Sequence, residues 1–338
     1  MARFLHSRLS SGMYKVTWRQ LLVLCVCVLT GLIYFSQGRR LSAVRLQPEE
    51  VRTTAEEEQH LFPVTTLWGA PLVWGDSEPS VWRRAEFSHH AFRVGLVVLA
   101  VGRYVHYLQG LLSSAELNFL PEVAVTYYIL TDSPRQLDPP PSLGPMRKLR
   151  VIPVAEMPGL KRLALRRMDL LAKFIKEQVQ WEVDYVYCMD VDQTFTGPVE
   201  TEILGKLVAT LHPGFYNKPR QTFPYETDKE SAAFVFEGEG DYYYTSEFYG
   251  GLCKRVLALV QSCSQLILKD EERGIHARIL EESYLNRYLI NNRPTCVLSP
   301  EYSWWESQNS PNVPTQRILS LGRKCGPLSK LNEDTQAC

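Results

Sequence analysis

Runs of consecutive apolar residues alternate with stretches in which apolar residues recur every three or four positions. Between residues 94 and 189 the runs predict buried strands, and the spaced stretches predict amphipathic helices. The predicted strands are 94–101, 123–130, 149–154 and 184–189, and the predicted helices are 103–120 and 160–179. Alternation of this kind is typical of a mostly parallel sheet covered by helices. The predicted fold class is therefore α/β, with a Rossmann-like, mostly parallel sheet.

The pattern is less regular beyond residue 200. We expect helices at 201–211, 254–268 and 280–290, extended segments at 241–244 and 247–249, and a strand at 295–305. A proline-rich stretch at 138–145 indicates a surface connection. The sequence contains no internal repeat.

An uncharged apolar run at residues 21–35 follows a basic leader. It is short for a membrane-spanning helix, which needs about 20 residues, so a cleaved signal peptide is the rival interpretation. The long leader and the absence of a clear small-residue cleavage site favour an uncleaved anchor. The basic leader then predicts a cytoplasmic tail at 1–20, a transmembrane signal anchor at 21–35, a lumenal stem at 36–60 and a folded domain at 61–338.

Composition narrows the classes of function. Lys plus Arg and Asp plus Glu balance at 37 each, so no overall charge attracts nucleic acid. None of the eight cysteines has the CxxC spacing of a zinc site. One or two disulfides are compatible with a lumenal domain, but Cys188 lies within a predicted apolar strand and is expected to be a buried free thiol. The chain lacks both GxGxxG and Walker A patterns, which argues against helix-cradled phosphate binding.

The candidate chemistry begins where the strand at 184–189 ends, in Asp190-Val191-Asp192. Residues separated by one intervening position in an extended segment point the same way, so both carboxylates are expected to face one side. In open α/β sheets, ligands bind beyond the carboxyl ends of the strands, where this pair falls. Paired carboxylates suit Mn²⁺ or Mg²⁺, which complete their shells with water and phosphate oxygens. Two solvated aspartates that merely end a strand are the alternative.

Several further motifs occur in a fixed order. They are "LWGAPLVWGDS", "VVLAVGRYV", "EVDYVYCMDVDQTF", "TLHPGFY", "FPYE", "EGDYYY", "FYGG", "EESYLNRYL" and "RPTCVLSPEY". Together they resemble glycosyltransferase family 6, which includes the ABO blood-group transferases, the α1,3-galactosyltransferase and the Forssman synthase. The resemblance covers roughly residues 66–304. It implies the GT-A type of glycosyltransferase fold, with a DxD metal site.

The resemblance also implies a reaction. We expect a retaining, Mn²⁺-dependent hexosyltransferase that moves galactose or N-acetylgalactosamine from a UDP-sugar to a terminal galactose of a glycolipid or glycoprotein, in α1,3 linkage. It implies a single-pass type II protein of the Golgi membrane with a lumenal catalytic domain. Its partners would be the UDP donor, the galactose-terminated acceptor and the membrane, with no nucleic acid.

Roles for individual residues follow from the same resemblance. Asp190 and Asp192 are the expected metal ligands. The expected nucleotide-sugar contacts are Leu99, Ala100, Val101, Tyr104, Arg167, Asp190, Val191, Asp192, Thr245 and Glu247. Leu99, Ala100 and Val101 could alternatively belong only to the strand core. Arg167 could alternatively be a cation on a helix surface.

Glu282 matches the family's catalytic glutamate. Retention requires a carboxylate that either attacks the anomeric carbon or stabilises an oxocarbenium-like state during front-face attack. An acid in the first turn of a helix, favoured by the helix dipole, is the alternative. The expected acceptor contacts are His212, Pro224, Trp304 and Glu282. His212 and Trp304 would equally suit structural roles.

The chain departs from the family pattern at several positions. Ile279, Leu280 and Glu281 stand where the family usually has Trp-His-Asp, and Thr245 and Glu247 replace small residues that discriminate between donor sugars. Pro224 stands where the ABO transferases have a threonine. Trp305 stands where the family has an aspartate on the acceptor side. A catalytically impaired lumenal binding protein that retains the fold is therefore the alternative to an active transferase. Because Glu247 leaves less room for an acetamido group, we expect UDP-galactose to be preferred over UDP-N-acetylgalactosamine.

Overall fold

The computed structural model describes Trp18 and residues 62–88, 90–137, 139, 141–157, 159–305 and 313–321. The predicted anchor at 21–35 lies outside these residues, as do the predicted stem and all of the predicted tail but Trp18. None of the helices among the described residues is long and apolar enough to cross a membrane.

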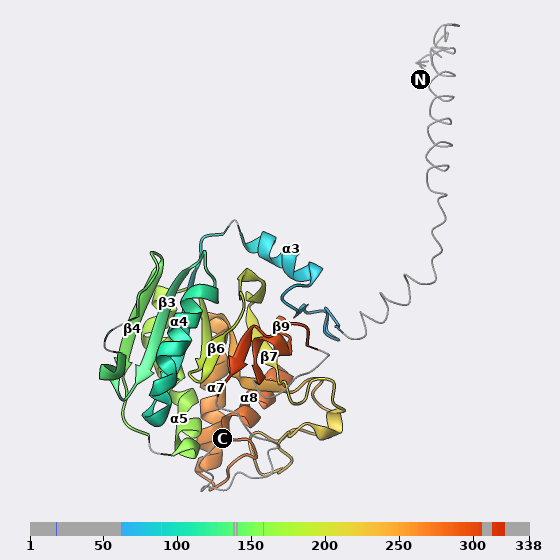
Figure 1. Cartoon of the computed structure of the whole chain (residues 1–338). Helices are drawn as coiled ribbons and strands as arrows, with labels where there is room; N and C mark the ends of the chain where they lie inside the picture. The colour runs from blue at the N-terminus through green and yellow to red at the C-terminus, as the bar shows by residue number, and fades with distance from the viewer. Residues whose placement is uncertain are drawn as a thin grey trace, which may run out of the picture. The chain divides into compact units, whose positions relative to one another are not determined.

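An eight-stranded sheet forms the centre of the folded part (Figure 1). Its strands, in spatial order, are β1 (Leu72–Val73), β9 (Cys296–Leu298), β7 (Leu207–Leu211), β8 (Tyr244–Leu252), β5 (Tyr185–Asp190), β2 (Arg93–Ala100), β3 (Ala124–Thr131) and β4 (Arg147–Pro153). All neighbours pair in parallel except β8, which is antiparallel to both β5 and β7. The predicted mostly parallel α/β sheet is confirmed.

Helices and a small second sheet surround this centre. The α-helices are α3 (Glu78–Phe87), α4 (Leu108–Asn118), α5 (Leu160–Phe174), α6 (Gln180–Glu182), α7 (Cys253–Glu271) and α8 (Leu280–Asn291). A π-helical turn (Ile175–Val179) joins α5 to α6, and short 3-10 helices occur at Gly102–Tyr107, Pro134–Leu137, Thr201–Ile203, Arg220–Thr222 and Pro300–Tyr302. The second sheet contains β10 (Trp304–Trp305), β11 (Ile318–Ser320) and β6 (Gln193–Phe195).

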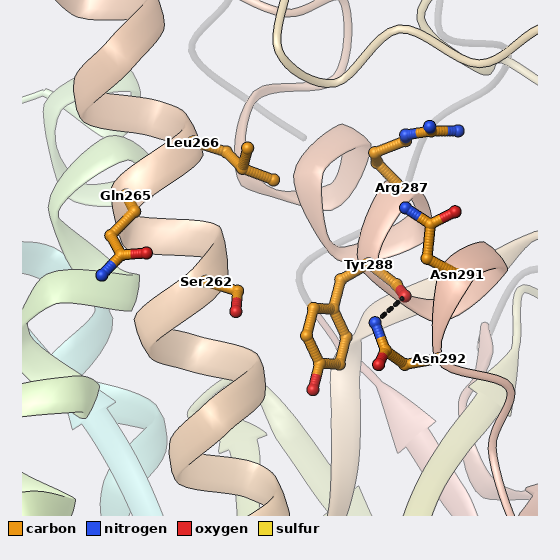
Figure 2. A pocket seen from close by; sticks show the side chains of 7 residues that line it. All are labelled: Ser262, Gln265, Leu266, Arg287, Tyr288, Asn291 and Asn292. Carbon is orange, nitrogen blue, oxygen red and sulfur yellow. Dashed lines mark hydrogen bonds between the residues drawn. The ribbon is translucent and has the colours of Figure 1, made fainter.

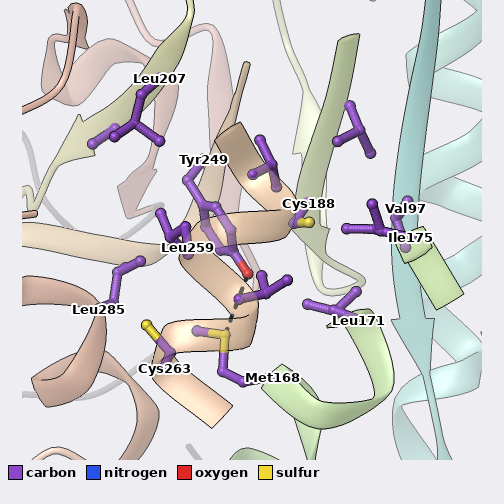
Figure 3. Close-up of a cluster of buried hydrophobic side chains, with 14 of the residues drawn as sticks. Val97, Met168, Leu171, Ile175, Cys188, Leu207, Tyr249, Leu259, Cys263 and Leu285 are labelled. Atoms are coloured by element: carbon purple, nitrogen blue, oxygen red, sulfur yellow. Dashed lines mark hydrogen bonds between the residues drawn. The ribbon is translucent and has the colours of Figure 1, made fainter. Parts of the chain in front are cut away.

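The alternating side chains of the central strands create two cores, one on each face of the sheet. Val97 packs with α5, α7 and α8, whereas its neighbours Leu96 and Val98 pack with α4. Figure 3 shows the first core, in which the Tyr249 hydroxyl reaches the sulfur of Met168 at 3.7 Å. Strands buried on both faces read as continuous apolar runs, which is why the sequence predicted them well.

Two predictions in the second half were wrong. Residues 201–211 form a 3-10 turn and the strand β7 instead of a helix. All five residues of β7 are buried in the middle of the sheet, so the strand shows no alternation that would distinguish it from a buried helix. The predicted strand at 295–305 is divided into β9, a 3-10 turn and β10, because Pro300 has no N–H with which to continue a ladder.

The described cysteines are free and buried. Cys188, Cys253, Cys263 and Cys296 are all thiols, so the prediction for Cys188 is confirmed. Burial raises the pKa of the Cys188 thiol to about 12, which keeps it protonated and unreactive. Cys325 and Cys338 lie outside the described residues.

Two consecutive glycines let β8 fit between its neighbours. A side chain at Gly250 would approach the ring of Tyr187 to 2.3 Å, so only glycine fits against β5. Gly251 has a φ of 133°, which disfavours other residues, and lies against the backbone of Lys206. The Gly-Gly pair therefore sets how closely β8 packs between β5 and β7.

Candidate active site

The carboxyl ends of β2 and β5 lie side by side, with Leu99 paired opposite Asp190. The predicted nucleotide-sugar contacts Leu99, Ala100 and Val101 thus reach the same edge of the sheet as the aspartate pair. Ala100 and Val101 are buried, while Leu99 and Tyr104 are partly exposed. Tyr104 belongs to the 3-10 turn that directly follows β2. The sheet topology therefore brings the first predicted donor contacts next to the predicted metal ligands.

Asp190 is the last residue of β5, and Asp192 lies in the turn that follows it. Val191, between them, is buried in the core, whereas both aspartates remain partly exposed. Because Asp192 lies in a turn and not in an extended segment, strand alternation does not fix its side, and the expectation that the two carboxylates face together stays a prediction. Within the described part of the chain, no group of three or more His, Cys, Asp or Glu side chains gathers as a ready-made metal cage. The donor set fits a hard cation such as Mn²⁺ or Mg²⁺ that takes its remaining ligands from phosphate and water.

Arg167, on α5, connects the aspartate pair to the start of α8. Its Nη1 lies 2.5 Å from Oδ1 of Asp190 and 3.9 Å from Oε1 of Glu281, and only 9% of its side chain is exposed. Burial lowers the pKa of Arg167, but the neighbouring charges, Asp190 foremost, outweigh it and raise the pKa above its ordinary value. The alternative in which Arg167 is a surface cation is wrong, because the guanidinium is buried as a permanent positive charge.

The altered tripeptide before Glu282 retains an acid at this site. Leu280 has a φ of 44°, an unusual value for a residue with a branched side chain. Helix α8 begins at this residue, so Glu281 and Glu282 fall in its first turn. Glu281 thereby faces Arg167, and the departure from Trp-His-Asp preserves a negative charge next to the guanidinium.

Glu282 reaches from α8 to β8. Its Oε2 accepts hydrogen bonds from the backbone N–H of Ser246 at 2.9 Å and from the Ser246 hydroxyl at 3.2 Å. The side chain is buried, with 4% of the residue exposed. A solvated first-turn acid would gain only from the helix dipole. The burial and the two donors hold this carboxylate at a defined place in the protein.

Thr245 and Glu247 flank Ser246 and are both buried. Oε2 of Glu247 accepts hydrogen bonds from Nε2 of Gln193 at 3.0 Å and from the hydroxyl of Ser303 at 2.7 Å. The Thr245 hydroxyl accepts from the backbone N–H of Glu247 at 3.2 Å. Glu247 therefore links β8 to the residue after Asp192 and to the residue before Trp304.

The C-terminal part of the described chain also reaches the aspartate pair. Strand β11 pairs with β6, and Ser320 lies opposite Gln193. The backbone N–H of Leu321 donates to the carbonyl of Asp192 at 2.7 Å. The loop that carries the second aspartate is thus supported by a segment more than a hundred residues later in the sequence.

An aromatic group surrounds His212, which is 1% exposed. Its ring centroid lies 5.5 Å from that of Trp305 and 5.6 Å from that of Tyr243. The Nδ1 atom accepts from the backbone N–H of Gly214 at 3.1 Å. Trp304 is buried and Trp305 is partly exposed, so Trp305 is the tryptophan next to His212 that faces solvent.

Pro224 lies between two members of the same aromatic region. It is buried, and the rings of its neighbours Phe223 and Tyr225 both pack on Tyr243. The predicted acceptor contacts His212 and Pro224 therefore belong to one region of the fold. Their role in binding stays a prediction.

A separate hollow of about 400 Å³ lies between α7 and α8 (Figure 2). It is lined by Ser262, Gln265, Leu266, Arg287, Tyr288, Asn291 and Asn292. Arg287 forms an ion pair of 2.8 Å with Glu239. None of the predicted site residues lines this hollow.

Comparison with known proteins accounts for this arrangement. The family model "Glycosyltransferase family 6" matches residues 39–323, which is most of the chain. The chain belongs to glycosyltransferase family 6. The predicted family and the predicted class of enzyme are confirmed, and these matches do not favour the alternative of an impaired binding protein.

Relatives of this family 6 glycosyltransferase include enzymes named for both sugars. The chain is 40% identical to human globoside alpha-1,3-N-acetylgalactosaminyltransferase 1 over 259 residues, which cover 75% of this chain and 72% of that protein. It is 39% identical to rat histo-blood group ABO system transferase 1 over 241 residues, 71% of this chain and 69% of that protein. It is 36% identical to human alpha-1,3-galactosyltransferase 2 over 241 residues, 71% and 70% of the two chains.

Three residues of this family 6 glycosyltransferase donate hydrogen bonds to predicted site residues but were not themselves predicted: Gln193, Ser246 and Ser303. Each contacts a residue that the sequence did identify, either Glu247 or Glu282. Serine and glutamine are common everywhere, and only the pairing of distant strands places them here. Gln193 alone had a signal, because it directly follows Asp192.

Proposed function

We propose that this glycosyltransferase moves galactose from UDP-galactose to a terminal galactose of a glycolipid or glycoprotein, in α1,3 linkage and with retention at the anomeric carbon. The observation that carries the proposal is the position of Arg167. It contacts Asp190 and lies near Glu281, so the predicted metal ligands and the segment that begins with Glu281 and Glu282 converge on one guanidinium. A UDP-sugar at this edge of the sheet would extend from the aspartates toward Glu282.

Asp190 and Asp192 are the residues that would hold Mn²⁺ together with the donor diphosphate. Bound there, the cation supplies neutralisation of the negative charge that develops on the leaving UDP. The partial exposure of both carboxylates supports this role, because a metal and a nucleotide must reach them from solvent. Leu99, Ala100, Val101 and Tyr104 would bind the uridine at the end of β2.

Glu282 would act at the anomeric carbon. As a carboxylate it stabilises positive charge on the sugar ring, or attacks the carbon from the face opposite UDP. The two hydrogen bonds that its Oε2 accepts hold the side chain in place for either route.

Galactose is the proposed donor sugar because of Glu247. Its side chain fills space where the family has a small residue, and its carboxylate is held by Gln193 and Ser303. A residue of this size leaves little room for the acetamido group of N-acetylgalactosamine. Since the relatives are named for both sugars, the donor must be measured for this chain.

The acceptor would bind on the aromatic side of the site. His212, Pro224 and Trp304 lie in or next to the region where aromatic rings gather, and such rings suit the apolar faces of galactose. The acceptor hydroxyl would then attack beside Glu282.

We further propose that the protein is a single-pass type II protein of the Golgi membrane, anchored by residues 21–35. The support is the apolar run after a basic leader. Protease digestion of intact microsomes that contain a C-terminally tagged chain tests the orientation. Protection of the tag until detergent is added is expected, and digestion without detergent would contradict the lumenal assignment.

Turnover by the full chain in detergent is the test of the reaction. UDP-galactose and UDP-N-acetylgalactosamine are offered with Mn²⁺ and with a panel of galactose-terminated glycolipids and oligosaccharides, and the product is analysed for linkage and anomeric configuration. We expect an α1,3-linked galactose product that disappears when EDTA removes the metal. No product from either donor on any acceptor would contradict the proposed function.

A further inference from the structure

Helix α8 attaches to β8 through side chains that replace a neighbouring strand. The pairing of β5 with β8 runs only as far as Met189 and Phe248, so the start of β8 extends beyond it. There Asn286 accepts from the backbone N–H of Tyr244 at 2.9 Å and donates to the carbonyl of the same residue at 2.8 Å. Asn286 thereby copies the hydrogen bonds of a strand.

One turn earlier on the same helix, Glu282 takes the next position along β8. Its Oε2 accepts from the N–H of Ser246, two residues after Tyr244. Alternate residues of a strand present their backbone groups on the same side, which explains why Glu282 and Asn286, four apart on a helix, meet residues two apart on the strand. The register of α8 against β8 is thus fixed at two points.

Ser246 adds a contact that the backbone alone does not supply. Its hydroxyl donates to the same Oε2 at 3.2 Å, and both residues are nearly inaccessible to water, with 5% of Ser246 and 4% of Glu282 exposed. A glutamate side chain rotates about three bonds, and one hydrogen bond leaves its carboxylate free to turn about that contact. Two donors on one oxygen, from one residue, restrict this rotation.

We propose that Ser246 is a positioning residue for Glu282. Its hydroxyl and its N–H together hold Oε2 and so orient the carboxylate toward the reacting sugar before the donor binds. This role rests on the proposed function, in which Glu282 acts at the anomeric carbon. Preorganised groups of this kind act chiefly on the rate of the chemical step, because small errors in orientation cost more in the transition state than in the bound substrate.

The test compares Ser246→Ala, which removes the hydroxyl and keeps the N–H, with Ser246→Thr, which keeps a hydroxyl. In the full chain in detergent, with Mn²⁺ and the donor that the wild type uses, we expect Ser246→Ala to lower kcat about tenfold, the size of one hydrogen bond to a charged group. The KM for the donor should change less than about twofold, because the same contact is lost in the ground state and matters less there. Ser246→Thr should recover most of kcat.

A double mutant separates positioning from structure. If Ser246 acts through Glu282, adding Ser246→Ala to Glu282→Gln should lower kcat by much less than tenfold, because the carboxylate that it orients is already gone. Ser80→Ala is the control for losing a buried serine hydrogen bond elsewhere, since the Ser80 hydroxyl bonds to the carbonyl of Trp74 and neither residue is a predicted site residue. It should alter stability without altering kcat.

Each outcome decides between the two proposals. A wild type that turns over no donor overturns the proposed function and the positioning role with it. An active wild type in which Glu282→Gln is slow but Ser246→Ala matches the wild type overturns only the positioning role. Equal loss from Ser246→Ala in the wild-type and Glu282→Gln backgrounds also overturns it, because the hydroxyl would then act independently of the carboxylate.

Discussion

Nη1 of Arg167 lies 2.5 Å from Oδ1 of Asp190, at the point where α5 meets the end of β5. The guanidinium is nine-tenths buried, whereas 29% of the Asp190 side chain is exposed. A pair with one partner at the surface keeps part of its hydration, so its loss costs less than that of a fully buried pair. The pair therefore holds Asp190, a predicted metal ligand, in place while leaving it open to solvent.

Arg167→Met should remove this support. We expect a loss of about 2 kcal/mol in the free energy of unfolding, below the roughly 3–5 kcal/mol of a fully buried pair, and a fall in kcat/KM for the donor of at least about 100-fold. Chemical denaturation and donor kinetics measure the two effects. Arg166→Met is the matched control, because Arg166 precedes it on α5 but is 45% exposed and 3.8 Å from Glu271. Comparable losses in both variants would contradict a specific role for Arg167.

Asp192→Asn should uncouple UDP binding from the metal. In the wild type we expect calorimetry to detect UDP binding with Mn²⁺ and little binding without it, since the two carboxylates would hold the cation together with the diphosphate. The variant should bind UDP weakly under both conditions. Asp184→Asn is the control, because Asp184 precedes the opposite end of the same strand and accepts from the N–H of Arg93 at 2.8 Å. Equal UDP affinity with and without metal in the wild type would refute the metal site.

Glu282→Gln should lower turnover by about 100-fold or more while leaving the fold stable. The amide keeps the shape and can still accept from Ser246, but it loses the negative charge that stabilises the transition state. Glu78→Gln is the matched control, because Glu78 is an exposed acid in the first turn of α3. Loss of a first-turn charge alone costs roughly 0.3–1 kcal/mol of stability. If Glu282→Gln shows only such a stability change, the catalytic role is wrong.

Glu247→Gly should open the donor pocket. We expect the wild type to use UDP-galactose in preference to UDP-N-acetylgalactosamine, and the glycine variant to use the N-acetylated donor better. Glu247→Gln is the control, since it keeps the bulk, removes the charge and can still accept from Ser303. A steric preference predicts that the glutamine variant retains the wild-type ratio of donors. The steric argument fails if the wild type prefers the N-acetylated donor.

Asp270 should make stability depend on pH. Burial raises its pKa, but hydrogen bonds from the Ser231 hydroxyl, the Ala232 N–H, the Tyr284 hydroxyl and Arg273 outweigh this, and the pKa lies below its ordinary value of 3.8. A lowered pKa stabilises the fold above the unfolded value and loses that stabilisation as pH falls through the folded value.

Asp270→Asn should therefore cost about 2 kcal/mol at pH 7 and progressively less below about pH 4, because the carboxylate of the unfolded wild type takes up a proton there before that of the folded protein does. Urea denaturation of the variant and the wild type between pH 7 and pH 3 measures the difference. Asp169→Asn is the control, because Asp169 pairs only along its own helix with the exposed Lys173. A difference that stays constant over this pH range would contradict the assigned protonation.

The sequence by itself determined the first half of the sheet, the helices that carry regular apolar spacing and the aspartate pair at the end of β5. These features are local: a strand buried on both faces is apolar throughout, and Asp190 and Asp192 are adjacent to the strand that carries them. Motif order added Glu282 and Arg167 through the family resemblance. The prediction of secondary structure from apolar spacing failed at β7, because a short strand that is buried at every position has no periodicity that distinguishes it from a helix.

Only the tertiary structure decided what these residues contact. Ser246 and Glu282 are separated by 36 positions, and Glu247 and Ser303 by 56. No local pattern identifies such a pair, because a serine in a buried strand has the same sequence signature whether or not a carboxylate faces it. The antiparallel insertion of β8 between β5 and β7 sets these contacts. Its position depends on the packing of the whole sheet, which allows Gly250 to pass Tyr187 and brings α8 against the start of β8, beyond the end of the pairing with β5.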